Sequence, residues 1–345
     1  MTPPDQTGSA RQPVPLTAAR RSAASRTTID GTRPALSLVS PASTKPPQHH
    51  SVLALWHLLS LDAPSVAALW TFAIARAVGL HLPWTEPAAM FVAVWMLYAS
   101  DRLLDARPLP DGSAPAELED RHRFHQRHRR GFLSMIVVAA CALVVLLHLL
   151  DPGALHLYAL LAALLSAWLL LIHARPAPSA ASHRMPKELA VGIFFPAAVF
   201  IPTVARLPQL RLDLLPAALL FAAVCTLNCL FLYAWEHPVT GTRTRTRAHW
   251  TTRWATNHLA ILAIVIAAAS CALVCSSLLH ALPSSSIRLQ HASALLAGCT
   301  LLSSLLLLLL HELRRALKPV HLRALADLVL LTPALLLPLA ALLDR

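Results

Sequence analysis

Apolar runs of about 18 to 25 residues recur from about residue 64 onward, and they constrain the fold more than any other feature of the sequence. Each run is long enough to cross, as a helix, a hydrocarbon core about 30 Å thick. Leu and Ala fill the runs continuously, whereas the strands of a membrane barrel alternate between apolar and polar residues. With 13% charged residues and a mean hydropathy of +0.57, the chain differs from an ordinary soluble domain. We therefore expect an all-α fold, a polytopic membrane helical bundle.

The hydropathy pattern predicts about nine spans, with boundaries good to a few residues. They lie at about 64–82, 86–100, 132–150, 154–174, 188–205, 213–234, 256–280, 291–310 and 323–343. The expected transmembrane domain covers residues 51–345. Residues 1–50 are rich in Pro, Ser, Thr and Arg and have no apolar period, so they predict a disordered cytoplasmic tail without a signal-peptide core.

The six cysteines all fall inside the apolar runs: Cys141, Cys225, Cys229, Cys271, Cys275 and Cys299. We interpret them as small buried hydrophobic residues and not as a disulfide framework. They leave the redox compartment open.

The basic residues predict the orientation of the chain in the membrane. Of the 29 Lys and Arg residues, 24 fall in the tail and in segments 101–130, 173–187, 235–255 and 311–323, on one side of the nine spans. The remaining five are Arg76, Arg206, Arg211, Arg288 and Arg345. This asymmetry indicates a cytoplasmic (inner) membrane protein with its N-terminus inside and its C-terminus outside. The net charge of +12 therefore reflects membrane orientation, and we expect no nucleic-acid partner. The long polar segments lie inside, where function should be sought.

Asp101 and Asp105 follow the second predicted span at a spacing of four residues. In a continuous helix they project from one face toward the same volume. Two such carboxylates suit Mg²⁺, which prefers oxygen ligands shared with substrate phosphates. The alternative is an interfacial aspartate that pairs with Arg102 or Arg107.

Segment 117–130 is rich in His and Arg, and its histidines recur every third residue. They could be metal ligands, but a basic, partly amphipathic helix on the anionic inner leaflet is the simpler interpretation. Its arginines would then also suit a phosphorylated headgroup, because guanidinium groups match phosphate oxygens.

Arg184 and Lys187 stand at the start of the fifth predicted span. There they could neutralise a diphosphate, or they could simply be basic residues flanking a span on the inside.

The sixth predicted span carries Asn228 and, two turns later on the same face, Glu236. A polar group at this depth is costly, which favours a functional role. A hydrogen bond between two helices would satisfy Asn228 equally well.

Together these features resemble the UbiA superfamily of intramembrane prenyltransferases, over roughly residues 55–343. That family has nine helical spans, Asp-rich motifs after spans two and six, and a basic residue at the start of span five. Asp101 and Asp105 match the second half of the first motif, while Leu97 and Tyr98 occupy its Asn-Asp positions. Lys187 matches the basic residue, and Glu236 supplies one carboxylate of the second motif, where Thr240 replaces another.

The resemblance implies Mg²⁺-dependent transfer of a prenyl group from a prenyl diphosphate to a lipophilic acceptor, aromatic acceptors included. Asp101, Asp105 and Glu236 would be the metal ligands. Arg102, Arg184, Lys187 and Asn228 would bind the diphosphate, and Asp101, Asp105 and Lys187 would be the catalytic residues.

Two other functions stay open. The incomplete motifs fit a catalytically degenerate relative that binds an isoprenoid or a partner protein. A transporter would show two halves with matching Gly- or Pro-broken spans, and the sequence has no such repeat.

Overall fold

A computed structural model of the protein describes residues 51–105, 124–173, 187–236, 250–279, 287–336 and 338. The described part of the chain is helical and contains no β-strand, which confirms the all-α prediction. The helices are α1 (Val52–Leu58), α2 (Asp62–Ala77), α3 (Thr85–Asp105), α5 (Arg129–His148), α6 (Pro152–His173), α7 (Lys187–Arg206), the short 3-10 helix η2 (Pro208–Leu210), α8 (Arg211–Glu236), α10 (Trp250–Asn257), α11 (Leu259–Leu279), α12 (Ile287–Leu313) and α13 (Pro319–Leu328).

Five of the described helical segments are long and apolar enough to cross a membrane: Arg129–His148, Leu189–Arg206, Pro208–Glu236, Leu259–Leu279 and Leu289–Leu313. The pair α1 and α2 makes a sixth if the two helices are taken together, although they meet at an angle of 88°. The protein is therefore a multi-pass helical membrane protein with five to six candidate spans. The predicted second span is not among them, because α3 ends in the charged residues Asp101, Arg102 and Asp105.

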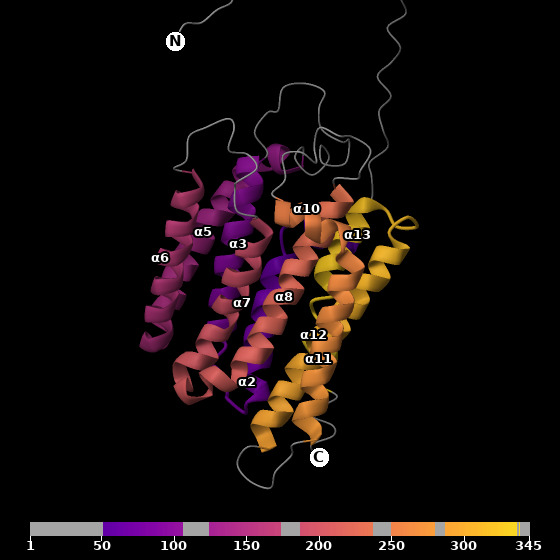
Figure 1. Cartoon of the computed structure of the whole chain (residues 1–345). Helices are drawn as coiled ribbons and strands as arrows, with labels where there is room; N and C mark the ends of the chain where they lie inside the picture. The colour runs from indigo at the N-terminus through magenta and orange to yellow at the C-terminus, as the bar shows by residue number, and fades with distance from the viewer. Residues whose placement is uncertain are drawn as a thin grey trace, which may run out of the picture. The chain divides into compact units, whose positions relative to one another are not determined.

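Four helices form the centre of the bundle. The packing closes a ring, since α2 lies against α7, α7 against α8, α8 against α12 and α12 against α2 (Figure 1). Outside this ring, α3 packs on α2 and carries α5, α6 packs on α7, and α11 packs on α12 and α8. The helix α13 contacts α1, α2, α8 and α12, and so fills the side of the ring near the α1–α2 bend.

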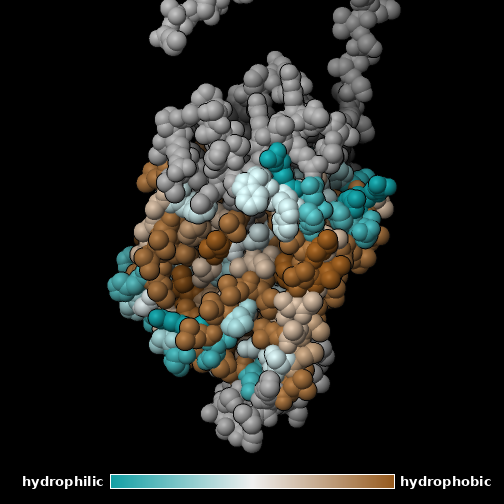
Figure 2. All heavy atoms as spheres, viewed as in Figure 1, coloured by the Kyte–Doolittle hydropathy of each residue, from teal (hydrophilic) through white to brown (hydrophobic). Residues whose placement is uncertain are grey.

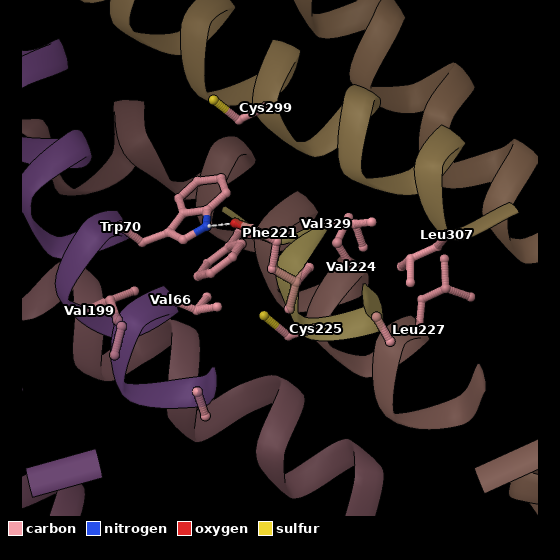
Figure 3. Packing of buried hydrophobic residues seen from close by; sticks show 14 of the residues in the cluster. Val66, Trp70, Val199, Phe221, Val224, Cys225, Leu227, Cys299, Leu307 and Val329 are labelled. Atoms are coloured by element: carbon pink, nitrogen blue, oxygen red, sulfur yellow. Dashed lines mark hydrogen bonds between the residues drawn. The ribbon is translucent and has the colours of Figure 1, made fainter. Parts of the chain in front are cut away.

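The core of the ring is a stack of aromatic side chains. Trp70 of α2 is fully buried and stacks on Phe221 of α8, with 3.8 Å between the ring centroids (Figure 3). Its indole Nε1 donates a hydrogen bond of 2.8 Å to the backbone carbonyl of Leu330. The indole thus supplies a large apolar area and also satisfies its one polar group, which buried Trp usually requires.

Hydroxyl groups hold the C-terminal helices together. Ser270 of α11 and Thr300 of α12 are 3.0 Å apart at their hydroxyl oxygens, and Ser303 donates to the carbonyl of Val329 over 2.8 Å. Helices in a membrane gain little from the hydrophobic effect when they associate, so such bonds and close packing carry the association.

The outward side chains are mostly apolar. Figure 2 shows a brown belt of hydrophobic residues across the middle of the visible face, with teal residues toward its two ends. All six cysteines are free. Cys225 and Cys299 are buried as expected, whereas Cys141, Cys271 and Cys275 lie on exposed faces of α5 and α11. The belt of hydrophobic residues in Figure 2 is the surface that the lipid hydrocarbon would cover.

Candidate functional site

A small cavity lies where α3, α7, α8 and α13 meet, beside the start of α2. Its volume is about 30 Å³, which is room for a water molecule and far too little for a diphosphate. The residues around it are Ala63, Val66, Tyr98, Val191, Phe195, Cys225, Asn228, Cys229, Asp327 and Leu330. The cavity matters because its lining residues identify the faces of α3, α7 and α8 that are turned toward one another.

The helix faces that line this cavity carry the residues predicted from the sequence, one or two turns further along. Asp101 and Asp105 follow Tyr98 by three and seven residues, and Glu236 follows Cys229 by seven. Residues three, four and seven apart share a helix face. By the same register Lys187 precedes Val191 by four residues and stands at the start of α7. Figure 1 shows that α3 and α8 end, and α7 begins, at the same end of the bundle.

The predicted carboxylates differ in their surroundings. Asp101 is exposed. Glu236 is half-buried, and one of its oxygens accepts from Arg323 Nη2 of α13 at 3.0 Å. The structure places Asp105 and Lys187 by their backbones, at the last residue of α3 and the first of α7. Arg184 lies outside the described residues, as do Arg107, Thr240 and residues 117–123 of the His- and Arg-rich segment.

Asn228 is buried at 4% exposure and forms the helix-to-helix hydrogen bond that was one of its two predicted roles. Its Nδ2 donates to Asp327 Oδ1 of α13 over 3.0 Å. The other amide atom, Oδ1, is buried and has no hydrogen-bond partner among the described residues. Asn228 also lines the small cavity, so it joins α8 to α13 and borders the site at the same time.

Arg102 turns away from the end of the bundle. Its side chain is buried, and Nη2 donates to Asp62 Oδ2 at 2.9 Å while Nη1 donates to Ser60 Oγ at 2.9 Å and to the backbone carbonyl of His57. Three acceptors from the α1–α2 bend thus use this guanidinium. The predicted alternative paired Arg102 with Asp101 or Asp105, whereas the partner that the structure gives to its guanidinium is Asp62 of α2.

A buried polar centre surrounds Arg102, and the sequence prediction missed it. Asp62 Oδ2 also accepts from His57 Nδ1 at 2.7 Å, and one ligand atom from each of His57, Asp62 and Asp327 falls within 4.8 Å of the other two. The signal was present in the sequence as an acidic residue directly before the first apolar run, at position 62. It was overlooked because the first span was predicted to begin at residue 64, beyond the bend.

Geometry alone would let His57, Asp62 and Asp327 bind a metal ion, but the charge argues for another role. The guanidinium of Arg102 already supplies positive charge 2.9 Å from Asp62. A metal ion bound to Asp62 would therefore lie close to the guanidinium of Arg102 and would be repelled by its positive charge. The buried polar centre therefore acts chemically as an ion-pair network that joins the α1–α2 bend to α3.

A second hollow lies on the other side of the bend, between α3 and α5. It measures about 470 Å³ and is lined by Leu59, Leu61, Phe91, Val92, Trp95, Phe124, His128, Gly131, Phe132, Met135, Val138 and Ala139. Trp95 fixes one wall, because its Nε1 donates to the carbonyl of Leu59 at 3.0 Å. Volumes of about 300 to 1,000 Å³ are typical of ligand sites. We call this hollow the α3–α5 groove.

No protein-family model, no curated protein and no solved structure matches this chain.

Proposed function

We propose that the protein transfers a prenyl group from a prenyl diphosphate to a lipophilic acceptor, in a Mg²⁺-dependent reaction at the bundle end where α3, α7 and α8 converge. One observation carries the proposal. The faces of these three helices that line one cavity bear Asp101 and Asp105, Lys187, and Glu236 within two turns of it. The proposal takes these charged residues, which come from distant parts of the sequence, to act together at that end of the bundle.

The proposed topology has nine spans, with the N-terminus inside and the C-terminus outside. Beyond the five to six candidate spans, it takes α3, α6 and α13 with the residues after it as further crossings. The polar bundle end then faces the cytoplasm, where a water-soluble diphosphate headgroup is accessible, while the prenyl chain lies in the membrane.

The carboxylates fit a hard divalent cation. Asp101 and Asp105 would hold Mg²⁺, because they offer oxygen ligands one turn apart on one helix face. Glu236 contributes less, since Arg323 already binds one of its oxygens. When bound, the ion would offset the negative charge that develops on the departing diphosphate.

The chain's own residues would do the remaining work. Lys187 and Arg184 would bind the diphosphate as it leaves with the electron pair of the broken carbon–oxygen bond. The allyl cation that remains would alkylate a carbon of the acceptor, which then loses a proton. The apolar helices would exclude water from the cation. Arg102 is not part of this set, because three acceptors of the α1–α2 bend occupy its guanidinium.

The test uses the full chain in lipid nanodiscs with Mg²⁺, labelled prenyl diphosphates of several lengths and a membrane-lipid extract as acceptor. We expect diphosphate release together with a labelled lipid product. Asp101→Asn and Asp105→Asn should each lower the rate by about 100-fold or more, since each removes a charge that acts on the transition state.

Asp213→Asn is the matched control, because Asp213 is an exposed aspartate in the first turn of α8, at the opposite bundle end. It should leave the rate unchanged. Unaltered turnover in both Asp101→Asn and Asp105→Asn would remove these residues from the mechanism.

A second candidate function is isoprenoid or partner binding without catalysis. The specific observation in its favour is the engagement of Glu236 by Arg323 and of Arg102 by Asp62, which leaves fewer charges for a diphosphate. Prenyl diphosphate that binds without release of diphosphate under any condition would favour this function over transfer.

A further inference from the structure

The α3–α5 groove is apolar along nearly its whole length. From His128 to Ala139, α5 and the turn before it border the groove over about 16 Å of helix. The facing wall consists of Phe91, Val92 and Trp95 of α3. An open groove of this length, lined by apolar side chains of α3, α5 and the α1–α2 bend, matches one hydrocarbon chain that lies parallel to the helices.

Gly131 keeps the groove open. A Cβ atom built on Gly131 would meet no atom within 4 Å, so the space beside it is empty of protein. Gly131 is the third residue of α5, where Gly has a lower helix propensity than Ala. The absence of a side chain here creates volume for a ligand without relieving any close contact in the protein.

The end of the groove at the start of α5 is strongly basic. Arg127, Arg129 and Arg130 are all exposed there, next to His128, which lines the groove. Residues 124–150 contain no Asp or Glu to neutralise them. His128 Nδ1 donates to the carbonyl of Phe124 at 2.9 Å, which fixes the ring at the mouth of the groove. Positive charge at one end and a hydrocarbon slot behind it match an anionic amphiphile.

We propose that the α3–α5 groove is a binding site for an anionic membrane phospholipid, with one acyl chain between α3 and α5 and its phosphate at Arg127, Arg129 and Arg130. Each Lys or Arg near a membrane surface adds to the attraction for anionic lipid, and guanidinium groups match phosphate oxygens. The groove shares no lining residue with the small cavity beside the proposed transfer site, so the proposal does not depend on the proposed function.

The experiment measures binding of individual lipids to the detergent-solubilised full chain by native mass spectrometry. Phosphatidylglycerol and phosphatidylcholine with identical chains are titrated in parallel. We expect phosphatidylglycerol to bind about tenfold tighter. Gly131→Leu should weaken binding of both lipids by about tenfold, because its side chain fills the slot. Arg127→Gln with Arg130→Gln should abolish the preference for phosphatidylglycerol and leave phosphatidylcholine unaffected.

The chain offers matched controls for both variants. Ser134→Leu adds a side chain of the same kind at an exposed position one turn further along α5 that does not line the groove. Arg315→Gln with Lys318→Gln removes two exposed charges after α12. Both controls should bind like the parent chain.

Three outcomes would overturn the proposal. Equal affinities for the two lipids would remove the role of the charge, and undiminished binding to Gly131→Leu would remove the groove. Displacement of phosphatidylglycerol by a prenyl diphosphate at lower concentration would assign the groove to that substrate class instead. The first two results leave the expected effects of the Asp101 and Asp105 variants on diphosphate release unchanged, so either proposal can fail while the other stands.

Discussion

Arg102 and Asp101 show how one residue of register separates a buried ion pair from an exposed charge. Neighbours in a helix point about 100° apart, so Asp101 stays exposed while Arg102 reaches Asp62 inside the bundle. The sequence predicted Asp101 as a metal ligand and Arg102 as a residue that binds the diphosphate. Which of them is buried depends on the partner, and Asp62 lies 40 residues away beyond a bend that hydropathy does not reveal.

Breaking the Arg102–Asp62 pair should strongly destabilise the fold. Arg102→Met leaves the Asp62 carboxylate buried without its guanidinium partner, although His57 Nδ1 and the amide of Ala63 still donate to it. The loss of one partner from a buried pair typically costs about 3 to 5 kcal/mol. The double variant Arg102→Met with Asp62→Asn should recover part of that loss, because no uncompensated carboxylate remains. The apparent Tm of the detergent-solubilised protein measures the effect. If the single and double variants were equally unstable, the charge pairing would not be the cause.

At the scale of elements, the α1–α2 bend depends on a residue in an unusual conformation. Ser60 has φ of 60°, and the amides of Ser60 and Leu61 donate to the carbonyls of His57 and Trp56, which is the hydrogen-bond pattern of a Schellman helix end. The end of α2 uses the same pattern, with Gly79 at φ of 77°. Serine stands where glycine is usual, because its Oγ accepts from Arg102.

Substitutions at Ser60 should separate backbone strain from the lost hydrogen bond. Ser60→Gly relieves the left-handed conformation but loses the bond to Arg102, so the net change should stay within about 1 kcal/mol. Ser60→Val keeps the strained left-handed conformation and also loses the bond to Arg102. A branched residue at this φ should lower the free energy of unfolding by about 2 kcal/mol or more. Thermal unfolding of both variants checks the order. A more stable Ser60→Val than Ser60→Gly would contradict it.

The close approach of α7 and α8 should not tolerate a larger residue at Gly192. A Cβ atom there would lie 1.7 Å from Thr226 Oγ1 and 2.9 Å from Thr226 Cβ. Gly192→Ala must push the helices apart, at a cost of about 1 to 3 kcal/mol. The movement would also displace Val191 from the small cavity, so prenyl transfer should fall together with the apparent Tm.

Gly131→Ala is the control for Gly192→Ala, because a Cβ at Gly131 meets nothing within 4 Å. The same change should there be neutral or slightly stabilising, through better helix propensity. Equal destabilisation at both positions would show that helix packing at Gly192 is not responsible.

At the scale of the whole molecule, the proposed topology predicts which loops a membrane-impermeant thiol reagent reaches. Gln209→Cys lies in η2 between α7 and α8 and should be labelled from outside, whereas Arg315→Cys after α12 should be labelled only from inside. Intact cells and inverted vesicles give the two measurements, with the parent chain as background. Labelling of Arg315→Cys in intact cells would reverse the orientation.

Much of the architecture could be predicted from the sequence, because long apolar runs leave few alternatives to helices. The positions of α3, α7 and α8 follow from the apolar runs. The helix faces on which Asp101, Asp105 and Glu236 lie follow from the helical period of 3.6 residues. Position 62 marked an acidic residue beside the first apolar run, but the α1–α2 bend and the contacts of Asp62 with His57 and Asp327 could not be predicted, since they join residues of different helices. Likewise, nothing local in α5 indicates that Gly131 borders a groove.

One consequence concerns α5, which makes extensive contact only with α3 in the described part of the chain and buries only 11% of its most apolar stretch. Such a helix owes its position to solvation by acyl chains more than to its protein neighbour. Its tilt should then follow the hydrophobic thickness of the bilayer. The ring holds α3 in place but does not hold α5, so a thinner bilayer would tilt α5 relative to α3. Membrane composition would then determine the width of the α3–α5 groove beside Gly131.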